Sequence, residues 1–330
     1  MNWNGASAVV TGACGFIGSH LVEALARRGA RVKALALYDA RGSLGRLEDL
    51  PADLRAAVSI IQGDVRDADM MRRLVAAGDR VFHLAALIGI PYSYNAPRSY
   101  VETNVTGTLN ILEAARAAGA ARILVASTSE VYGTALRVPI GEDHPLQAQS
   151  PYSASKIGAE KLAESYFRSF ALPCVVARPF NTYGPRQSPR AVIPTILMQL
   201  LKGCPHIALG DTETTRDFNF VEDTVEGLIR LADCDDAVGR TVNIGTGTDV
   251  SIRHVAQTAQ EVLGVRAEIR TDQARMRPAA SEVRRLCADN SLLLKLTGWT
   301  PPARLAEGLA ATARWMKDRL RDFDTERYYV

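Results

Sequence analysis

The sequence predicts an α/β fold in which a doubly wound, mostly parallel sheet is joined to a smaller C-terminal α/β part. Three observations point to this class. Over the first 180 residues, short apolar runs alternate with longer segments of helical period, which is the pattern of strands separated by crossover helices. The runs contain few polar positions, as strands covered on both faces require. A glycine-rich turn follows the first run.

Each apolar run is expected to form one strand of the sheet. Helices are expected to follow Gly15, Asp67, Pro97 and Pro151. The predicted strands are Ser7 to Val10, Arg31 to Leu37, Val58 to Gln62, Arg80 to Leu84, Arg122 to Ser127 and Cys174 to Arg178.

The turn after the first strand reads Thr-Gly-Ala-Cys-Gly-Phe-Ile-Gly over residues 11–18. Glycines there permit a tight turn and let backbone N–H groups approach a pyrophosphate, while the N-terminus of the next helix adds partial positive charge. The position between a strand and a helix predicts a Rossmann-type dinucleotide site. Its predicted cofactor-binding residues are Gly12, Gly15, Phe16, Ile17 and Gly18.

The regular alternation ends after Arg178, where proline, glycine and arginine crowd residues 178–190. The segment Thr241 to Ile244 is strand-like again, so we expect the chain to return once to the sheet. The predicted dinucleotide-binding domain is therefore residues 1–180 with about 221–250, and the predicted substrate-binding domain is residues 181–220 with 251–330.

Composition excludes several classes of function. The 39 basic and 36 acidic residues are spread along the whole chain, so we expect neither a nucleic-acid surface nor a polybasic membrane surface. The odd number of cysteines, five, is typical of free thiols in a reducing compartment, and none has the spacing of a metal site. No apolar run is long enough to cross a bilayer. We expect a cytoplasmic protein without a bound metal.

The end of the second predicted strand bears on the choice between NAD and NADP. An acidic residue there would hold the adenosine ribose and disfavour a 2′-phosphate. Asp39 arrives late, and Arg41 and Arg46 are near enough in sequence to meet a phosphate. The sequence favours NAD slightly and leaves NADP open, with Arg41 as a candidate cofactor contact.

A tyrosine and a lysine lie four residues apart at the start of the helix expected after Pro151. Tyr152 and Lys156 therefore project from one face. A lysine ammonium and a nicotinamide ring close by would favour the tyrosine phenolate and make it a usable base. The hydroxyl of Thr128, at the end of an earlier strand, is placed to bind the oxygen whose proton Tyr152 removes.

The glycine turn, the Thr128 hydroxyl and the Tyr/Lys pair together resemble the extended branch of the short-chain dehydrogenase/reductase superfamily, the NAD-dependent epimerases and dehydratases of nucleotide sugars. The resemblance spans essentially the whole chain. It implies an adenine-edge contact at Asp64 and Val65. It also implies that Leu84, Ala85 and Ala86 form a small-residue wall beside the cofactor, with the preceding His83 structural.

Glu130 distinguishes reactions within that family. Oxidation and re-reduction of one sugar carbon require only the tyrosine and the cofactor. A 4,6-dehydratase must also remove the C5 proton while the C6 hydroxyl leaves as water, and a carboxylate such as Glu130 suits that task. Many similar dehydratases have an aspartate where this chain has Ser129. The triplet Thr128-Ser129-Glu130 resembles that of GDP-mannose 4,6-dehydratases, in which the glutamate serves both steps, and also that of UDP-glucuronate decarboxylases.

The second half of the chain carries the expected substrate contacts. The resemblance implies that Asn181 and Arg216 hold the substrate diphosphate, and arginine is suited to a multidentate anion. Further candidates are Arg186, Arg190, Val192 and Arg277.

The sugar is suggested by three stretches. Residues 277–284 are similar to a segment of the GDP-mannose dehydratases, while residues 82–94 and 186–195 resemble the N-acetylglucosamine nucleotide 4,6-dehydratases of legionaminic-acid pathways. We therefore expect a 4,6-dehydratase acting on a UDP- or GDP-linked N-acetylglucosamine or related hexose. The alternatives are a 4-epimerase, a UDP-glucuronate decarboxylase, and a cofactor-sensing protein without catalysis.

The family resemblance also implies a homodimer. Members commonly pair through two helices, including the one that bears the tyrosine, to form a four-helix bundle. The small and apolar residues Ala154, Ile157, Ala159, Leu162 and Ala163 would permit that contact.

Overall fold

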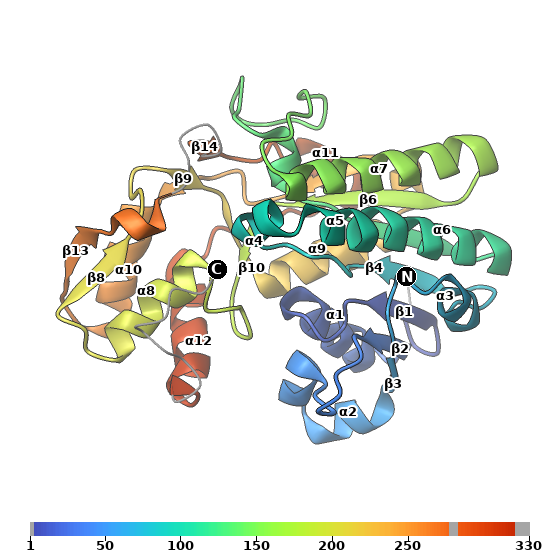
Figure 1. Cartoon of the computed structure of the whole chain (residues 1–330), viewed down its shortest axis with the longest axis horizontal. Coiled ribbons are helices and arrows are strands. Elements are labelled where there is room, and N and C mark those ends of the chain that lie inside the picture. The colour runs from blue at the N-terminus through green and yellow to red at the C-terminus, as the bar shows by residue number, and fades with distance from the viewer. Residues whose placement is uncertain (1–2, 277–282, 321–330) are drawn as a thin grey trace.

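The computed structural model describes residues 3–276 and 283–320, and the largest feature of these residues is a sheet of seven parallel strands (Figure 1). The strand order is β11-β6-β5-β4-β1-β2-β3. The first strand, β1, lies inside the sheet, and later strands are added on both sides of it, which confirms the doubly wound α/β fold. The strands are β1 (Ser7–Thr11), β2 (Arg31–Ala36), β3 (Ser59–Gln62), β4 (Arg80–His83), β5 (Arg122–Ala126), β6 (Cys174–Pro179) and β11 (Thr241–Ile244).

The predicted strands agree with these bounds to within one residue at each end. Their registers align the carboxyl ends. Thr11 of β1 lies opposite His83 of β4, and Ala126 of β5 lies opposite Ala177 of β6. The segments that follow these strands therefore gather at one edge of the sheet, where ligands bind in open α/β folds.

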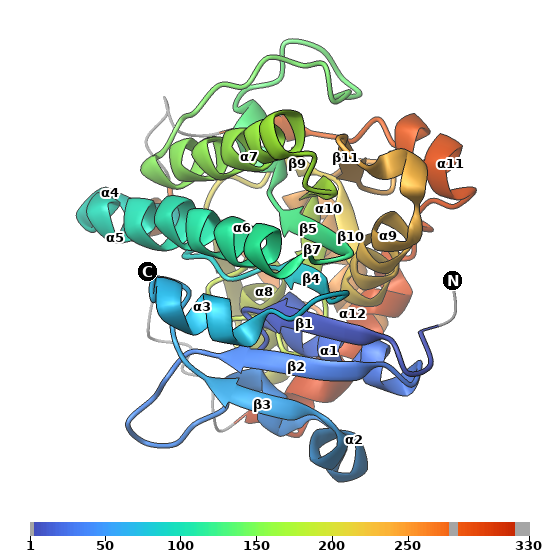
Figure 2. The same cartoon turned by 90° about the vertical axis from the view of Figure 1, so that its right-hand side faces the viewer.

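Helices cover both faces of the sheet, as Figure 2 shows. Successive residues of a strand point to opposite faces. Val10 packs with α1 (Phe16–Arg27) and α9 (Val221–Asp233) in one apolar cluster. Val9 packs in a second cluster against α3, α6 and α7. The last three are α3 (Ala68–Leu74), α6 (Gly107–Ala118) and α7 (Pro151–Phe170).

The helix expected after Pro97 contains a rare irregularity. It begins as α5 (Pro97–Tyr100), widens into the π-helical turn η2 (Val101–Thr106) and continues as α6. A π turn inserts one extra residue into a helix and often marks a functional position. This turn carries Asn104, whose side chain bonds to the loop after β4 and to α7.

A second, smaller lobe lies beside the sheet (Figure 1). Its apolar core joins α8 (Val192–Leu201), α10 (Ile252–Leu263) and α12 (Leu305–Lys317) with the two-stranded sheet of β8 (His206–Leu209) and β13 (Glu268–Thr271). The remaining elements are η1 (Gly45–Asp49), α2 (Ala52–Ala57), α4 (Ile90–Asn95), η3 (Ser129–Tyr132), β7 (Asn181–Tyr183), β9 (Thr215–Arg216), β10 (Phe218–Phe220), η4 (Asp235–Ala237), β12 (Val250–Ser251), η5 (Gln273–Arg275), β14 (Arg285–Leu286) and α11 (Ser291–Thr297).

Polar contacts hold the two lobes together near α1. The His20 imidazole contacts the Pro185 carbonyl at 3.0 Å. Between η1 and α12, the Trp315 ring lies between the guanidinium groups of Arg46 and Arg319, whose central carbons are 5.1 and 4.8 Å from the ring centroid. The loop beside the predicted cofactor site is thus fixed to the smaller lobe.

All five cysteines are free, as the odd count predicts. No helix in the described part of the chain combines the length and apolar character needed to cross a membrane.

Two of the residues named for helix pairing are not on an outer face. Ala159 and Ala163 have no exposed surface and pack inside the chain's own fold. Sequence spacing placed them on α7 but could not show which face of that helix meets the sheet. Ala154 is exposed, while Ile157 and Leu162 are half-buried.

Candidate active site

The glycine turn forms a tight cradle at the carboxyl end of β1. Gly12 has a φ of +69°, and a Cβ there would lie 2.7 Å from the Ala85 nitrogen. A Cβ at Gly18 would lie 2.1 Å from the Gly12 carbonyl oxygen. Only glycine fits these positions. Gly15 is the N-cap of α1 and supplies no side-chain cap, so backbone N–H groups at this helix end remain for a phosphate, with Phe16 and Ile17 in the first turn.

The segment after β2 folds back onto the cradle. The Arg46 backbone nitrogen donates to the Cys14 carbonyl at 2.9 Å. Asp39 is half-buried and accepts from the Arg41 backbone nitrogen, and the Arg41 side chain is exposed. The Arg46 side chain contacts Trp315 and lies 3.6 Å from the Asp49 carboxylate. Of the two arginines considered for a ribose phosphate, Arg46 is therefore engaged elsewhere.

The two residues after β3 differ in environment. Val65 is buried against Gly107 of α6. The Asp64 carboxylate pairs with the Arg66 guanidinium at 2.6 Å, and this hydrogen bond holds the pKa of Asp64 below its usual range. The pair is at the same sheet edge as the cradle, so an adenine contact at Asp64 and Val65 stays a prediction with compatible geometry.

The segment after β4 is tied to β1 through His83. The Ala85 backbone nitrogen donates to Thr11 Oγ1 at 3.2 Å, and Thr11 Oγ1 is 2.8 Å from His83 Nδ1. On the other side of the ring, His83 Nε2 is 3.0 Å from Thr108 Oγ1, which donates to the Asn104 carbonyl. The Thr108 hydroxyl therefore accepts from Nε2–H, and Thr11 donates to Nδ1. Leu84, Ala85 and Ala86 are half-buried beside the cradle.

His83 is neutral in this arrangement. It is 1% exposed, and burial, aided by the Lys156 charge, lowers its pKa to about 3. The predicted structural role of His83 agrees with these contacts, since both ring nitrogens are used to connect a strand with a helix.

Asn104 continues this network to the catalytic helix. Its side chain accepts from the Leu87 backbone nitrogen at 2.8 Å and donates to the Leu87 carbonyl at 3.0 Å. It also donates to Ser155 Oγ at 2.9 Å, and Ser155 donates to the Tyr152 carbonyl at 2.7 Å. One chain of hydrogen bonds thus runs from the cradle strand to α7. Asn104 was not predicted from the sequence, because an ordinary helical period does not indicate the π turn that orients it.

The structure brings Thr128, Tyr152 and Lys156 together at the ends of β5 and α7. The Lys156 ammonium donates to the Ala126 carbonyl at 2.6 Å. Burial lowers the pKa of Lys156 to about 8. Burial raises the pKa of Tyr152 well above its usual value, while a hydrogen bond with Thr128 acts in the opposite direction. Helix α7 begins at Pro151, one residue before Tyr152, and its first turn is fixed by a capping box formed by Ser150 and Ser153.

Glu130 is half-buried in the 3₁₀ turn that directly follows Thr128. Its backbone nitrogen donates to Thr128 Oγ1 at 3.2 Å, and its charge acts on the Tyr152 phenol, raising the pKa of that group. Ser129 is buried beside it. Glu130 therefore belongs to the turn that follows Thr128, whose hydroxyl hydrogen-bonds with Tyr152, and its role in the reaction stays a prediction.

A tyrosine that was not predicted from the sequence lies on the other side of Tyr152. The Tyr100 ring meets the Tyr152 ring edge-on at 6.3 Å between centroids, and its hydroxyl donates to the Gly89 carbonyl. No sequence signal marks Tyr100, because its contact with Tyr152 joins two helices that are distant along the chain.

Two predicted substrate residues lie where the smaller lobe approaches this edge. Asn181 lies just after β6, and its Oδ1 is buried without a hydrogen-bond partner among the described residues. The Arg190 side chain is exposed and lies beside the Gly89 loop, because a Cβ at Gly89 would be 3.4 Å from its Nη1. Val192 is the first residue of α8 and packs against the core of the smaller lobe.

Two further predicted substrate residues, Arg186 and Arg216, are paired with other groups of the protein. Arg186 pairs with Glu23 of α1 at 2.5 Å, so it joins the two lobes. Arg216 is buried and donates to the carbonyls of Thr215 and Arg284 at 2.9 and 3.5 Å. Arg277 lies outside the described residues. Substrate contacts by these three arginines stay predictions.

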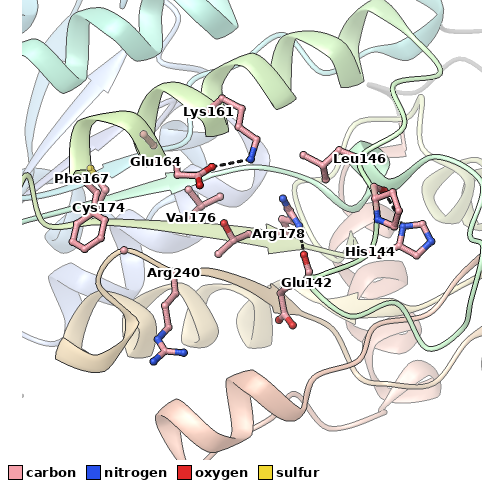
Figure 3. A pocket seen from close by; sticks show the side chains of 14 residues that line it. Glu142, His144, Leu146, Lys161, Glu164, Phe167, Cys174, Val176, Arg178 and Arg240 are labelled. Carbon is pink, nitrogen blue, oxygen red and sulfur yellow. Dashed lines mark hydrogen bonds and ion pairs between the residues drawn. The ribbon is translucent and has the colours of Figure 1, made fainter. Parts of the chain in front are cut away.

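A pocket of about 340 Å³ lies on the far side of α7 (Figure 3). Lys161, Glu164 and Phe167 line it from the helix, and Arg178 and Arg240 line it from the strand side. Neither Tyr152, Lys156 nor the glycine cradle borders it, so this pocket is separate from the candidate active site.

Comparison with known proteins shows which family this chain resembles. The family model described as GDP-mannose 4,6 dehydratase matches residues 9–312. The UDP-glucose 4-epimerase of Mycolicibacterium smegmatis is 35% identical over 317 residues, which are 94% of this chain and 98% of that protein. The dTDP-glucose 4,6-dehydratase of Streptomyces antibioticus is 34% identical over 314 residues, 94% of this chain and 92% of that protein.

A solved structure of a dehydratase is also similar to this chain. DesIV, the dTDP-glucose 4,6-dehydratase of Streptomyces venezuelae solved with NAD bound, has a TM-score of 0.87 and 29% identity, with 97% of this chain and 100% of that chain covered. Dehydratases and epimerases are thus both among the similar proteins.

Proposed function

This chain belongs to the NAD-dependent epimerase/dehydratase family of extended short-chain dehydrogenases/reductases, and we propose that within this family it is a nucleotide-sugar 4,6-dehydratase. Family membership means that the homologous proteins are enzymes acting on nucleotide sugars. The finer choice between dehydration and epimerisation rests on the residues of the catalytic edge.

The cradle fits an NAD pyrophosphate. Gly12 and Gly18 leave no room for side chains, and the N-terminus of α1 is uncapped by any side chain of the described residues. Gly15, Phe16 and Ile17 would hold the phosphates, Arg41, Asp64 and Val65 the adenosine end, and Leu84, Ala85 and Ala86 the far end. When bound, NAD accepts a hydride from the sugar and later returns it. Arg46 is held by Trp315 and Asp49, which favours NAD over NADP.

Tyr152 is the proposed base that removes the hydroxyl proton at C4. Burial holds its pKa high in the protein alone. The positive nicotinamide ring and the Lys156 ammonium, which stay close by when the cofactor is bound, would lower it. Thr128 would bind the same sugar oxygen and orient it. These three groups suffice for oxidation at C4 in either reaction.

The observation that carries the proposal is the Glu130 carboxylate beside Tyr152. Once C4 is a ketone, the C5–H bond is acidic, and Glu130 can take that proton. The electron pair of that bond forms a C5–C6 double bond as the C6 hydroxyl leaves, protonated to water. Ser129 stands where similar dehydratases have an acid, so we assign the donation of that proton to Glu130 as well. The sugar then regains at C6 the hydride that it lost from C4 and gains a proton at C5, so the reaction conserves redox state overall.

The proposed substrate is a UDP- or GDP-linked N-acetylglucosamine or a related hexose. Its diphosphate would be bound by Asn181 and Arg216, and Arg190, which lies beside the Gly89 loop, would contact the sugar. The unpartnered buried oxygen of Asn181 is an acceptor, so it supports a contact from a ligand hydroxyl, while the amide nitrogen of the same side chain would donate to the diphosphate. Arg186, Val192 and Arg277 are proposed to complete this side of the site.

A 4-epimerase is the second candidate, because the similar proteins include the Mycolicibacterium smegmatis UDP-glucose 4-epimerase. Epimerisation would use Thr128, Tyr152 and Lys156 in the same roles. It would not require a carboxylate at position 130.

Product mass separates these reactions. The protein is incubated with NAD and, in turn, UDP- and GDP-N-acetylglucosamine, GDP-mannose and UDP-glucuronate. We expect loss of one water from an N-acetylglucosamine nucleotide, and we expect Glu130→Gln to abolish that loss. Loss of carbon dioxide from the glucuronate would show a decarboxylase instead. Unchanged mass with a changed sugar stereochemistry, retained in Glu130→Gln, would show an epimerase and refute the proposal.

A further inference from the structure

Arg178 is a charged residue in the interior that the proposed reaction does not use. It lies in β6, is 4% exposed and forms a two-point ion pair with Glu160 of α7. Nε donates to Oε1 at 2.8 Å, and Nη2 donates to Oε2 at 2.6 Å. Glu160 is 3% exposed. Figure 3 shows Arg178 below α7, with its side chain directed toward the loop that carries Glu142.

The third nitrogen of the same guanidinium contacts a second segment. Arg178 Nη1 donates to the Tyr132 hydroxyl oxygen at 2.8 Å, and its central carbon lies 4.8 Å from the centre of the Tyr132 ring. The Tyr132 hydroxyl in turn donates to Asn243 Oδ1 of β11 at 2.6 Å. Tyr132 has no exposed surface, so both of its bonds are shielded from water.

These contacts join the two segments that carry the catalytic groups. Glu160 is one helical turn after Lys156 and two turns after Tyr152 on α7. Tyr132 is two residues after Glu130 in the turn η3. One rigid, planar guanidinium therefore connects the helix of the C4 base with the turn of the C5 base.

Stability alone is a weak reason for this arrangement. Taking a buried ion pair out of water costs about as much as its attraction returns, so apolar residues would often serve as well. What the pair does supply is a defined geometry, since a bidentate pair fixes the orientation of both partners.

We propose that Arg178, Glu160 and Tyr132 form a positioning unit that sets the separation of Glu130 from Tyr152 and Lys156, and that the elimination of water depends on it more than oxidation at C4 does. The inference rests on the proposed dehydratase function. Oxidation uses groups on α7 and β5. Elimination adds Glu130, which must reach the carbon next to the one Tyr152 serves, and a misplacement of about 1 Å can cost about 100-fold in rate.

The unit also shapes the charge around Lys156. Glu160 raises the pKa of Lys156 against the lowering effect of burial. From the other elements packed there, neutral His83 of β4 and the Ala126 carbonyl of β5 face the same ammonium. Glu160 is thus the negative charge that keeps Lys156 protonated.

The first test is Tyr132→Phe in the full-length protein loaded with NAD. The variant keeps the ring and removes the hydroxyl that links η3 to Arg178 and Asn243. Three signals are measured during a single turnover. Absorbance reports reduced nicotinamide, NMR reports exchange of the C5 proton with deuterated water, and mass spectrometry reports the product. We expect C4 oxidation within about twofold of the wild type, and C5 exchange and water loss slower by about 10- to 100-fold. Reduced cofactor should accumulate.

Tyr166→Phe is the matched control. Like Tyr132, Tyr166 is a buried tyrosine with a hydrogen-bonded hydroxyl. It lies on α7, and its hydroxyl contacts Glu113, away from the catalytic edge. It should leave both steps unchanged. If Tyr132→Phe slows both steps equally, or neither, the positioning unit is refuted, since a purely structural role would not separate them.

A second variant tests the link to α7 by a reaction that every candidate function shares. Glu160→Gln removes the negative charge and keeps a side-chain oxygen that can still accept a hydrogen bond from Arg178. Without Glu160 the pKa of Lys156 falls, so the loss of C4 oxidation at alkaline pH should begin at lower pH than in the wild type. An unchanged pH profile would refute this part of the proposal.

These outcomes are distinguishable from failure of the proposed function. If the wild type removes no water from any nucleotide sugar, the dehydratase proposal fails. The decrease in the rate of C4 oxidation at alkaline pH still decides whether Glu160 acts on Lys156.

Discussion

The two sides of the active site are built differently. On the sheet side, the groups that join the strands to the catalytic helix, Thr11, His83, Thr108 and Asn104, all have hydrogen-bond partners within the protein. On the side of the smaller lobe, several buried polar atoms have none among the residues that the structure describes, among them Asn181 Oδ1, Arg186 Nη1 and Gln187 Oε1. Ser127 Oγ is the exception on the sheet side.

This difference indicates which part of the site exists before ligands arrive. A fully paired polar network in a low-dielectric interior is rigid, and removal of one member leaves its neighbours unsatisfied. An unpaired buried oxygen costs free energy until a donor reaches it. The sheet side is therefore formed in the protein alone, and the proposed substrate would supply the missing partners on the side of the smaller lobe.

The largest expected effect comes from the chemistry of the preformed side. Tyr152→Phe should lower kcat/KM by about 100- to 10,000-fold, because the variant lacks the hydroxyl that takes the proton at C4. Binding of NAD and of the nucleotide sugar should change little, as measured by calorimetry. A variant that keeps more than about a tenth of wild-type turnover would show that another residue serves as the base.

The second effect tests rigidity on the same side. His83→Leu leaves the Thr11 and Thr108 hydroxyls without their ring partner, and we expect a loss of about 2–4 kcal/mol in the free energy of unfolding. Urea denaturation followed by circular dichroism measures it. Tyr166→Phe serves as a control for loss of a single hydrogen bond. A cost below about 1 kcal/mol would mean that the network does not act as a unit.

The third prediction concerns the side of the smaller lobe, where we expect a substitution to weaken substrate binding without lowering stability. Asn181→Ala removes an oxygen that has no partner among the described residues, so the free energy of unfolding should stay the same or rise slightly. KM for the nucleotide sugar should increase by up to about tenfold, with kcat changed much less, since one hydrogen bond from a neutral ligand hydroxyl contributes about 0.5–1.5 kcal/mol. Lower stability with unchanged KM would contradict a ligand role for Asn181.

The fourth prediction is a pH dependence of stability from buried His83. Its pKa is about 3 in the folded protein, against the usual 6.5 of an exposed histidine. Below pH 6.5 the unfolded chain binds a proton there that the folded chain does not, so stability decreases as the pH falls from about 6.5 toward 3. Each pH unit in that window costs about 1.4 kcal/mol. His83→Leu should show a shallower slope between about pH 6.5 and 5 in urea titrations, and an identical slope would refute the assignment.

The seven strands of the sheet could be predicted because their signals are local. An apolar run covered on both faces looks the same wherever it packs, so β1 to β6 and the returning strand β11 were predicted to within one residue. The cradle and the Tyr152/Lys156 pair were also predictable, since each lies within one turn or one helical repeat.

The contacts between distant segments could not be predicted in this way. The pairing of Arg178 with Glu160, of Arg186 with Glu23, and of Asn104 with Leu87 joins side chains whose sequence neighbourhoods carry no mark of one another. The burial of Ala159 and Ala163 depends on which face of α7 meets the sheet.

The sequence by itself therefore determined the fold class, the place of the glycine turn and the spacing of the candidate pair Tyr152 and Lys156, because short-range periodicity and spacing encode them. Only the tertiary structure decided which arginines are held inside the protein, which polar atoms stay unpaired, and how the turn of Glu130 is fixed to the helix of Tyr152. Those properties follow from side chains brought together by chain crossovers, and a one-dimensional pattern does not contain the distances between them.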